Sequence, residues 1–239
     1  MTKKLSILHI YPKDMNIYGD NGNVLVVKKR AEWHGYEPVV IDYNPGDTFP
    51  NDIDIIVGGG GQDSGQDKIQ SDLHKIGPKI IQLANQKTPM LVVCGLYQLF
   101  GKFFKTQDGH IIKGIGLLDV ETIAGSERLI GNITIKSSDF GEIIGYENHS
   151  GQTYLGDNIR PLGEVIRGAG NNNKDGLEGA RFNNVIGSYL HGSLLPKNPK
   201  IADFLLECAA INRYGSFSQT VIDDSLATSA REYAMRRPR

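Results

Sequence analysis

The sequence is poor in cysteine, in net charge and in long hydrophobic runs. Its two cysteines, Cys94 and Cys208, lie in different contexts, so we expect free thiols in a reducing cytoplasm rather than a disulfide framework. The 26 Lys and Arg residues almost balance 27 Asp and Glu residues, which argues against broad electrostatic binding to nucleic acid or to an anionic membrane. No apolar run approaches the roughly 18 residues of a membrane-spanning helix, and no signal-peptide apolar region follows residues 1–5. We therefore expect a soluble, cytoplasmic protein without membrane insertion.

The length and the glycine content indicate the class of fold. A chain of 239 residues suits one large domain, here taken as residues 1–239, and 29 glycines are typical of a loop-rich α/β protein. Strands are predicted at 5–10, 38–42, 53–57 and 90–93, and helices at 24–33, from Gly61 to about Gln86, and at 95–104. Pro78 is expected to break or restart the second of these helices. This alternation predicts an open, mostly parallel sheet flanked by helices.

The second half of the chain has a different pattern. Short strands separated by glycine turns are predicted at 117–122, 131–136, 142–147 and 164–166, which indicates extra antiparallel or mixed strands. A loop at 171–176, a strand at 185–190 and helices at 201–212 and 223–235 follow. The basic tail is expected to be a solvated terminus, with partner docking as the alternative. Its arginines are Arg231, Arg236, Arg237 and Arg239.

Cys94 has the context of a catalytic nucleophile. It follows an apolar strand and precedes Gly95 and a helix, which is the strand–turn–helix pattern of a nucleophile elbow. A helix N-terminus favours the thiolate, and the Gly95 N–H could point at an oxyanion. The competing interpretation is a small apolar residue that ends a buried strand. That interpretation is assigned to Cys208, which lies on an apolar helical stripe.

His191 is the predicted base for this thiol. It also ends an apolar strand, and two parallel strand ends could bring it beside Cys94. A hydrogen-bonded histidine at a strand terminus is the competing interpretation. His149 is the second candidate, and the other histidines lie in helical or turn contexts without convergent polar residues.

Two further features fit an acyl-transfer site. Glycines 58–61 follow a predicted strand and could offer N–H donors to an oxyanion. Phosphate binding is the alternative, but no Lys-Ser/Thr follows at Walker spacing and Asp63 takes the third place of a G-x-G-x-x-G motif. Arg128 could pair bidentately with a substrate carboxylate, although an ordinary surface arginine is the simpler interpretation. No two histidines have zinc-ligand spacing, so neither a metal nor a cofactor is expected.

Three segments are together similar to class I glutamine amidotransferases of the cobyric-acid-synthase type. They are CGLYQ at residues 94–98, the glycine turn at 58–60 and YLHG at 189–192. Within this family, residues 16–23, 145–149 and 190–198 resemble the glutaminase subunits of lipid II isoglutaminyl synthases. The resemblance runs from about Leu5 to Leu206, which is nearly the whole chain.

The resemblance implies the ammonia-producing subunit of a two-subunit enzyme, with L-glutamine as its substrate. Cys94 would attack the side-chain amide to give a thioester, and His191 would protonate the leaving amine and then activate water. The N–H groups of Gly60 and Gly95 would hold the oxyanion, and Arg128 would bind glutamine. Ammonia would pass to a Mur-ligase-like synthetase of the MurT type, which uses ATP to amidate D-glutamate of the lipid II stem peptide in peptidoglycan synthesis. Lipid II would be reached through that partner.

The sequence departs from many class I members directly after the catalytic histidine. Those proteins continue with Pro-Glu, whose carboxylate orients the imidazole, whereas Gly192 and Ser193 follow His191 here. The third member of a triad is therefore open between Asp20, Glu147 and no carboxylate at all.

Two other functions stay open at this point. One is a non-catalytic, amidotransferase-like binding module, against which the intact pair of Cys94 and His191 argues. The other is a cysteine hydrolase such as a γ-glutamyl peptidase, which reaction with free glutamine would separate from a glutaminase.

Overall fold

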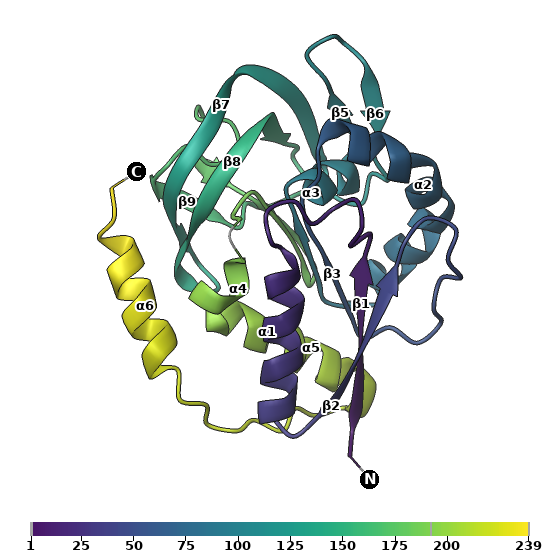
Figure 1. Ribbon diagram of the computed structural model, residues 1–239, viewed down its shortest axis with the longest axis vertical. Helices are drawn as coiled ribbons and strands as arrows, with labels where there is room; N and C mark the ends of the chain where they lie inside the picture. Colours follow the sequence, from purple (N-terminus) through teal and green to yellow (C-terminus); the bar gives the residue numbers. More distant parts are fainter. Residues whose placement is uncertain (1, 192, 239) are drawn as a thin grey trace.

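Two six-stranded sheets organise the chain (Figure 1). The computed structural model describes residues 2–191 and 193–238, so Met1, Gly192 and Arg239 lie outside the described residues. The first sheet contains β1 (Lys4–Ile10), β2 (Glu37–Tyr43), β3 (Ile55–Gly58), β4 (Met90–Val93), β11 (Ala180–Phe182) and β12 (Val185–Ser188). Its strand order is β11-β12-β4-β3-β1-β2, and all neighbours are parallel except β11 and β12. The predicted open, mostly parallel sheet is confirmed.

Helices cover both faces of this first sheet. The covering helices are α1 (Asn21–Trp33), α2 (Asp63–Asn85), α3 (Gly95–Phe100) and α5 (Pro199–Tyr214), and the chain also contains α4 (Leu194–Lys197) and α6 (Ser225–Met235). The crossovers β1-α1-β2 and β3-α2-β4 run outward in opposite directions, so right-handed connections place α1 and α2 on opposite faces (Figure 1). Every residue of β3, β4 and β12 is buried, as expected for strands covered on both sides.

The strand order reverses between β1 and β3, and this reversal fixes where a ligand can bind. In open α/β sheets, ligands bind beyond the carboxyl ends of the strands at such a switch point. Here the chain leaves β1 at Tyr11, β3 at Gly59, β4 at Cys94 and β12 at Tyr189. The candidate nucleophile and base thus follow adjacent parallel strands.

The second sheet is mixed and built around one long hairpin. Its strands are β5 (Phe103–Lys105), β6 (Ile111–Lys113), β7 (Val120–Ser137), β8 (Gly141–Leu155), β9 (Gly163–Arg167) and β10 (Leu177–Glu178). β7 and β8 pair antiparallel with a register shift between Ala124 and Leu129, and β5 pairs parallel to β7. The mixed pairing is as predicted, and the short strand at 164–166 is present as β9. The separate strands predicted at 117–122 and 131–136 are wrong, because both contribute to the continuous strand β7.

Two predicted helix boundaries are also wrong. α3 ends at Phe100 because Gly101 is extended, and Phe103–Lys105 then pair with β6 and β7 instead of continuing the helix to residue 104. Pro78 lies inside an unbroken α2. Because proline has no N–H, the His74 carbonyl has no donor within the helix. Pro78 and His74 both lie on the exposed face of α2, where water can hydrogen-bond to that carbonyl.

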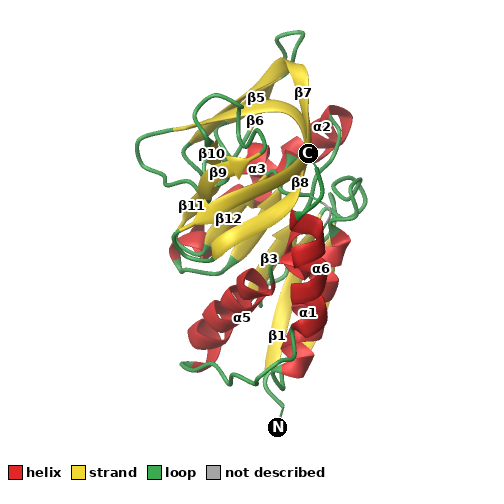
Figure 2. Cartoon of the chain, turned by 90° about the vertical axis from the view of Figure 1, so that its left-hand side faces the viewer, coloured by secondary structure: helices red, strands yellow, loops and turns green. Residues whose placement is uncertain are grey.

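The C-terminal residues form an arm outside the core. After α5, residues 216–224 run along the base of the molecule, and α6 then lies against the side of the fold (Figures 1 and 2). α6 contains no buried residue. Among the described residues, none of the helices combines the length and apolar character required to cross a membrane.

Candidate active site

Cys94 occupies the turn between β4 and α3 in a rare backbone conformation. Its φ is 52° and its ψ is −108°, outside the regions that non-glycine residues usually adopt. The Cys94 N–H donates to the Ser188 carbonyl of β12 at 2.8 Å, and its carbonyl accepts the Gln98 N–H at 3.0 Å. The side chain is only 6% exposed. The strand–turn–helix elbow predicted from the sequence is present.

His191 meets Cys94 around Gly60, as the parallel strand ends predicted. A Cβ atom on Gly60 would lie 2.9 Å from His191 Cε1 and 3.4 Å from Cys94 Sγ, so both side chains face the same point. The His191 N–H donates to the Tyr146 carbonyl at 2.7 Å, and the Tyr18 ring lies over the imidazole with 4.4 Å between the centroids. Only a glycine fits between the two groups.

Asp20 is the carboxylate next to His191. Its Oδ1 lies 3.5 Å from His191 Nδ1, and both side chains are buried. Burial opposes the imidazolium, but the neighbouring Cys94 sulfur and Asp20 carboxylate outweigh it and raise the pKa of His191. Glu147, the other carboxylate considered, accepts the N–H groups of Ala169 and Gly170 at 2.8 and 2.9 Å. The geometry therefore favours Asp20 as the group that orients the imidazole.

The prediction that the Gly60 N–H serves as an oxyanion donor needs correction. This N–H donates to Asp20 Oδ2 at 2.8 Å, so it fixes the carboxylate instead of facing a substrate. The next residue, Gly61, lines the cavity beside Cys94, and its N–H has no acceptor within the described part of the chain. A Cβ atom on Gly95 would lie 3.2 Å from this nitrogen. The N–H groups of Gly61 and Gly95 are thus the neighbouring pair of candidate donors.

A cavity of about 410 Å³ extends from Cys94 to Arg128. Arg128 lies at the register shift of β7 and donates to Asn148 Oδ1 and to the Tyr18 hydroxyl, both at 2.7 Å. Besides Cys94, Gly61 and Arg128, its lining residues are Ile17, Tyr18, Gln62, Asp63, Ser64, Gln66, Gln98, Phe104, Asn148, Ser150 and Gly151. A small amino acid fits this volume, with its carboxylate at the arginine and its side chain at the thiol.

A buried polar network supports the cavity floor. Gln66 donates to Gln98 Oε1 at 2.9 Å, and Gln98 donates to the Tyr189 hydroxyl at 3.0 Å. The Tyr189 hydroxyl also lies 2.6 Å from Thr153 Oγ1. Because each group is held by the next, the two glutamine amides have defined orientations.

His149, the second candidate base, supports this floor rather than lining the cavity. Its Nδ1 lies 2.7 Å from the Gly151 carbonyl, and its ring stacks on Tyr189 with 3.6 Å between the centroids. Burial lowers the pKa of His149 to about 3, so the ring is neutral at physiological pH.

Cys208 is remote from the site, and its assignment to the core needs qualification. It is half-buried on α5, and the stripe that contains it ends at Ile211, which is 46% exposed. Burial raises the pKa of the Cys208 thiol to about 11. Among the described residues, no cluster of His, Cys, Asp or Glu side chains could hold a metal ion.

The sequence prediction missed Tyr18 and Asn148 as functional residues. Tyr18 bridges the imidazole and Arg128, and Asn148 accepts from Arg128. Both lie in segments that resemble the glutaminase subunits, residues 16–23 and 145–149, and that was the available signal.

Comparison with known proteins agrees with this geometry. Residues 6–199 match the family described as CobB/CobQ-like glutamine amidotransferase domain. A Staphylococcus aureus protein named lipid II isoglutaminyl synthase (glutamine-hydrolyzing) subunit GatD is 38% identical over 96% of this chain and 94% of its own length. A Streptococcus pneumoniae protein of the same name is 39% identical over 89% of this chain and 83% of its own length.

Solved structures share the fold at lower identity. A chain in the structure of PurLQS from Thermotoga maritima superposes with a TM-score of 0.59 at 16% identity, covering 86% of this chain and 98% of that one. A glutamine amidotransferase from the same organism gives a TM-score of 0.54 at 14% identity, covering 97% and 90%. These likenesses support the α/β architecture.

Proposed function

The chain belongs to the CobB/CobQ-like glutamine amidotransferase family and is a glutamine amidotransferase subunit, and from this premise we propose that it is the glutaminase subunit of a lipid II isoglutaminyl synthase. It hydrolyses L-glutamine to glutamate and ammonia in the cytoplasm. Similarity to two GatD subunits over most of the chain supports the choice of this synthase.

One observation carries the chemistry: Cys94, His191 and Asp20 converge around Gly60. A Cβ atom on Gly60 would contact the Cys94 and His191 side chains, and the Gly60 N–H donates to the Asp20 carboxylate. A thiol, an imidazole and a carboxylate in this order form the arrangement that activates a nucleophile in acyl transfer. The cavity beside them reaches Arg128.

The first step forms a tetrahedral adduct, which becomes a thioester when the C–N bond breaks in the next step. The Cys94 thiolate attacks the carbonyl carbon of the glutamine side-chain amide, a C–S bond forms, and the carbonyl oxygen becomes an oxyanion. The N–H groups of Gly95 and Gly61 stabilise this oxyanion. The Gly95 N–H is at the start of α3, where a helix has no internal acceptor for it.

The second step releases ammonia and then glutamate. The His191 imidazolium gives its proton to the leaving nitrogen, the C–N bond breaks, and ammonia departs. His191 then accepts a proton from water, which attacks the thioester and frees the Cys94 sulfur. The Asp20 carboxylate holds the imidazole in position and stabilises its charged form.

Arg128 binds the α-carboxylate of glutamine in this mechanism. Its guanidinium is oriented by Asn148 and Tyr18 at the far end of the cavity. A planar fork that offers two parallel N–H donors recognises a carboxylate bidentately.

The partner in this proposal is a Mur-ligase-like synthetase of the MurT type. It binds ATP and the stem peptide, and it uses the ammonia to amidate D-glutamate of lipid II. This chain supplies the ammonia and contacts lipid II only through the partner.

The decisive experiment measures glutamate release from glutamine by the purified chain, alone and with a MurT-type partner. Wild type is compared with Cys94→Ala, and Cys208→Ala serves as the matched control because it removes the other thiol. We expect Cys94→Ala to abolish release, Cys208→Ala to retain it, and the partner to stimulate wild type.

Other outcomes select another function. Turnover that persists in Cys94→Ala would overturn the thioester mechanism. Absence of release from wild type under both conditions favours an amidotransferase-like binding module. Cleavage of γ-glutamyl peptides without hydrolysis of free glutamine favours a cysteine peptidase.

A further inference from the structure

Asn198 is a buried polar residue at the end of the 190–198 segment, and the proposed mechanism gives it no role. It is 4% exposed, and all its hydrogen-bonding positions are used. Its Oδ1 accepts the Ile144 N–H at 3.0 Å, and its Nδ2 donates to the carbonyls of Ile144 and Leu194 at 2.8 Å. The Asn198 amide thus pairs with both backbone groups of Ile144 in β8 and holds α4 against that strand.

The same strand holds His191. The His191 N–H donates to the Tyr146 carbonyl, two residues along β8 from Ile144. The segment from His191 to Asn198 is therefore attached to β8 at both ends. A third contact, from the Leu195 N–H to Asn23 Oδ1 at 2.9 Å, joins it to the start of α1, close to Asp20.

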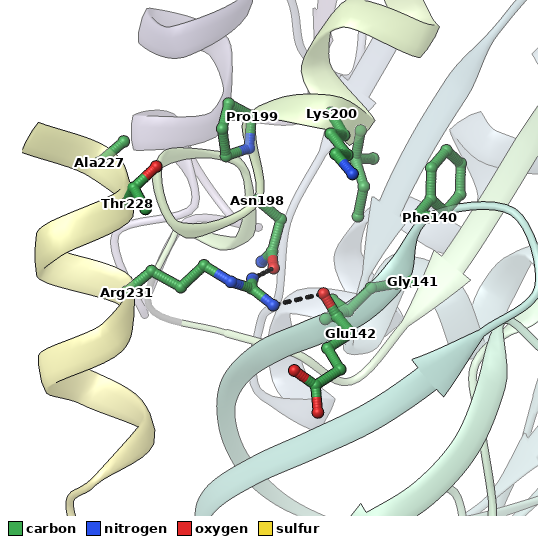
Figure 3. Close-up of a pocket in the computed structure, with 11 residues that line it drawn as sticks. Phe140, Gly141, Glu142, Asn198, Pro199, Lys200, Ala227, Thr228 and Arg231 are labelled. Atoms are coloured by element: carbon green, nitrogen blue, oxygen red, sulfur yellow. Dashed lines mark hydrogen bonds between the residues drawn. The ribbon is translucent and has the colours of Figure 1, made fainter. Parts of the chain in front are cut away.

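Arg231 completes the hydrogen bonds of Asn198 from outside the core. Its guanidinium donates to Asn198 Oδ1 at 2.6 Å and to the Glu142 carbonyl (Figure 3). It also donates to the Lys197 carbonyl at 3.1 Å. Three acceptors from β8 and the end of α4 thus converge on one side chain of α6. This contact corrects the expectation of a solvated tail for Arg231, whereas Arg236 and Arg237 are exposed.

Packing of apolar side chains does not explain why α6 lies there. α6 has no buried residue, and a cavity of about 290 Å³ separates it from β8 and α5 around Arg231 (Figure 3). The family match ends at residue 199, before α6. The Arg231 guanidinium is thus the side-chain group of α6 that joins this helix to the His191 segment.

We propose that Arg231 is a positioning residue for His191, acting through Asn198. The inference rests on the proposed glutaminase function. Arg231 fixes Asn198 against β8, and Asn198 fixes α4, which begins three positions after His191 in the sequence. Holding α4 and the His191 backbone on the same strand keeps the imidazole beside Cys94. A base held in place by such contacts loses rate rather than substrate affinity when they are removed.

The test uses the full-length chain with Arg231→Met, which keeps the length of the side chain and removes its donors. Arg231→Lys is the conservative variant, and Arg236→Met is the matched control because it removes an exposed arginine at the end of the same helix. We expect Arg231→Met to lower kcat for ammonia release by about 10-fold, with KM changed by less than about twofold. Arg231→Lys should recover part of the rate, and Arg236→Met should behave as wild type.

Alkylation by iodoacetamide at neutral pH gives a second readout that does not require turnover. Because the thiolate is the reactive form and a nearby imidazolium favours it, displacement of His191 slows alkylation of Cys94. We expect a several-fold slower reaction at Cys94 in Arg231→Met, in the direction of His191→Ala. Cys208, read on its own peptide, should react at the wild-type rate.

The outcomes separate this inference from the proposed function. Wild-type kcat and wild-type Cys94 alkylation in Arg231→Met overturn the positioning role. Faster alkylation of both cysteines, with kcat and KM impaired together, also overturns it, because the variant has then only loosened the fold. Wild-type protein without glutamine turnover overturns the proposed function, and the alkylation rates still decide the role of Arg231.

Discussion

Cys94 holds a conformation that the surrounding structure must impose. A non-glycine residue with φ of 52° and ψ of −108° costs about 1–3 kcal/mol. The four buried residues of β4 before it and the six buried residues of α3 after it leave the chain no other path. The strain is typical of a nucleophile elbow, in which it directs the side chain out of the sheet and towards the cavity.

The first prediction concerns Asp20. Asp20→Asn should lower kcat for glutamine hydrolysis by about 100-fold, because an amide can neither stabilise the imidazolium charge nor reliably fix the ring. KM for glutamine should change little, since Asp20 does not line the cavity. Steady-state kinetics of glutamate release will measure both constants.

The matched variant for Asp20 is Glu147→Gln, at the other carboxylate that the sequence left open. Glu147 binds the N–H groups of Ala169 and Gly170, so its replacement should affect stability more than kcat at equal amounts of folded protein. A larger loss of kcat in Glu147→Gln than in Asp20→Asn would assign the third catalytic role to Glu147 instead.

The second prediction concerns Arg128. Arg128→Ala should raise KM for glutamine by about 10- to 100-fold, because charge-assisted hydrogen bonds to a carboxylate are worth about 1.5–3 kcal/mol. Arg128→Lys keeps the charge and loses the planar fork, so its KM should lie between those of wild type and Arg128→Ala. An unchanged KM in Arg128→Ala would return Arg128 to an ordinary surface arginine.

The sequence predicts the site residues that can be identified from the residues directly beside them in the chain. Cys94 and His191 each end an apolar strand beside a glycine, and that local pattern suffices to pair them. The Gly60 prediction was wrong because its N–H binds Asp20, a residue 40 positions away. Tyr18 reaches Arg128 across an even longer separation of 110 positions, which no local pattern can encode.

At the scale of elements, glycines inside β7 and β8 explain the largest error. Glycines between the predicted short strands were interpreted as turns, but Gly125 lies within β7 and Gly151 within β8. A Cβ atom on Gly145 would lie 2.7 Å from the Leu190 side chain, and one on Gly151 would lie 2.3 Å from Gln98 Nε2. These glycines allow β8 to approach the segments of Leu190 and Gln98 closely, and such an approach depends on tertiary contacts that the sequence pattern does not contain.

The strands of the first sheet could be predicted because their signal is local. Apolar runs of four to seven residues alternate with amphipathic helices, and burial on both faces makes such runs continuous. Pro78 shows the limit of the approach. Proline was expected to interrupt α2, but it breaks a helix only where the lost hydrogen bond cannot be replaced by water.

The third prediction concerns Glu178, which connects β10 to the end of β12. Its Oε1 accepts from the Ser188 hydroxyl and the Tyr189 N–H, both at 2.8 Å, just before His191. Burial raises the pKa of Glu178 from 4.5 to about 7, against the effect of these hydrogen bonds. The folded state therefore binds the Glu178 proton more tightly than the unfolded state does. The contribution of this proton to the free energy of unfolding is complete below pH 4.5, and it is lost as the pH rises to about 7.

Glu178→Gln should remove that dependence on pH. Relative to wild type, the variant should gain up to roughly 3 kcal/mol of unfolding free energy between pH 4.5 and pH 8. Urea unfolding at several pH values measures the gain, and Glu164→Gln on the neighbouring strand β9 is the exposed control. A variant that follows the wild-type pH curve would show that Glu178 titrates normally in the folded protein.

At the scale of the whole molecule, charged contacts join the C-terminal part of the chain to α1. Arg30 of α1 is 3% exposed and forms ion pairs at 2.6 Å with Asp203 of α5 and with Asp224 at the start of α6. Arg231 attaches α6 to the end of α4, and the backbones of Ser218, Thr220, Met235 and Pro238 make further hydrogen bonds to the fold. Polar contacts therefore hold the arm at several points along its length, while the hydrophobic core contains no residue of α6.

The last prediction follows from this architecture. The segment 216–224 should be the first site of limited proteolysis by a nonspecific protease, because it is irregular and Val221 is 98% exposed. The remaining fragment should stay folded, since every buried core residue precedes position 216. An isolated helix as short as α6 is marginal in water, so the cleaved arm should separate on gel filtration.

Loss of the arm should reproduce the effect of Arg231→Met. The cleaved protein should show a kcat lowered by about the same factor, on the order of 10-fold, with an almost unchanged KM. Arg231→Met itself should be cut faster than wild type because the hydrogen bonds of Arg231 to Asn198, Lys197 and Glu142 are missing. A cleaved core that aggregates would place α6 within the folding unit, and full glutaminase activity after removal of the arm would show that His191 is positioned by the core alone.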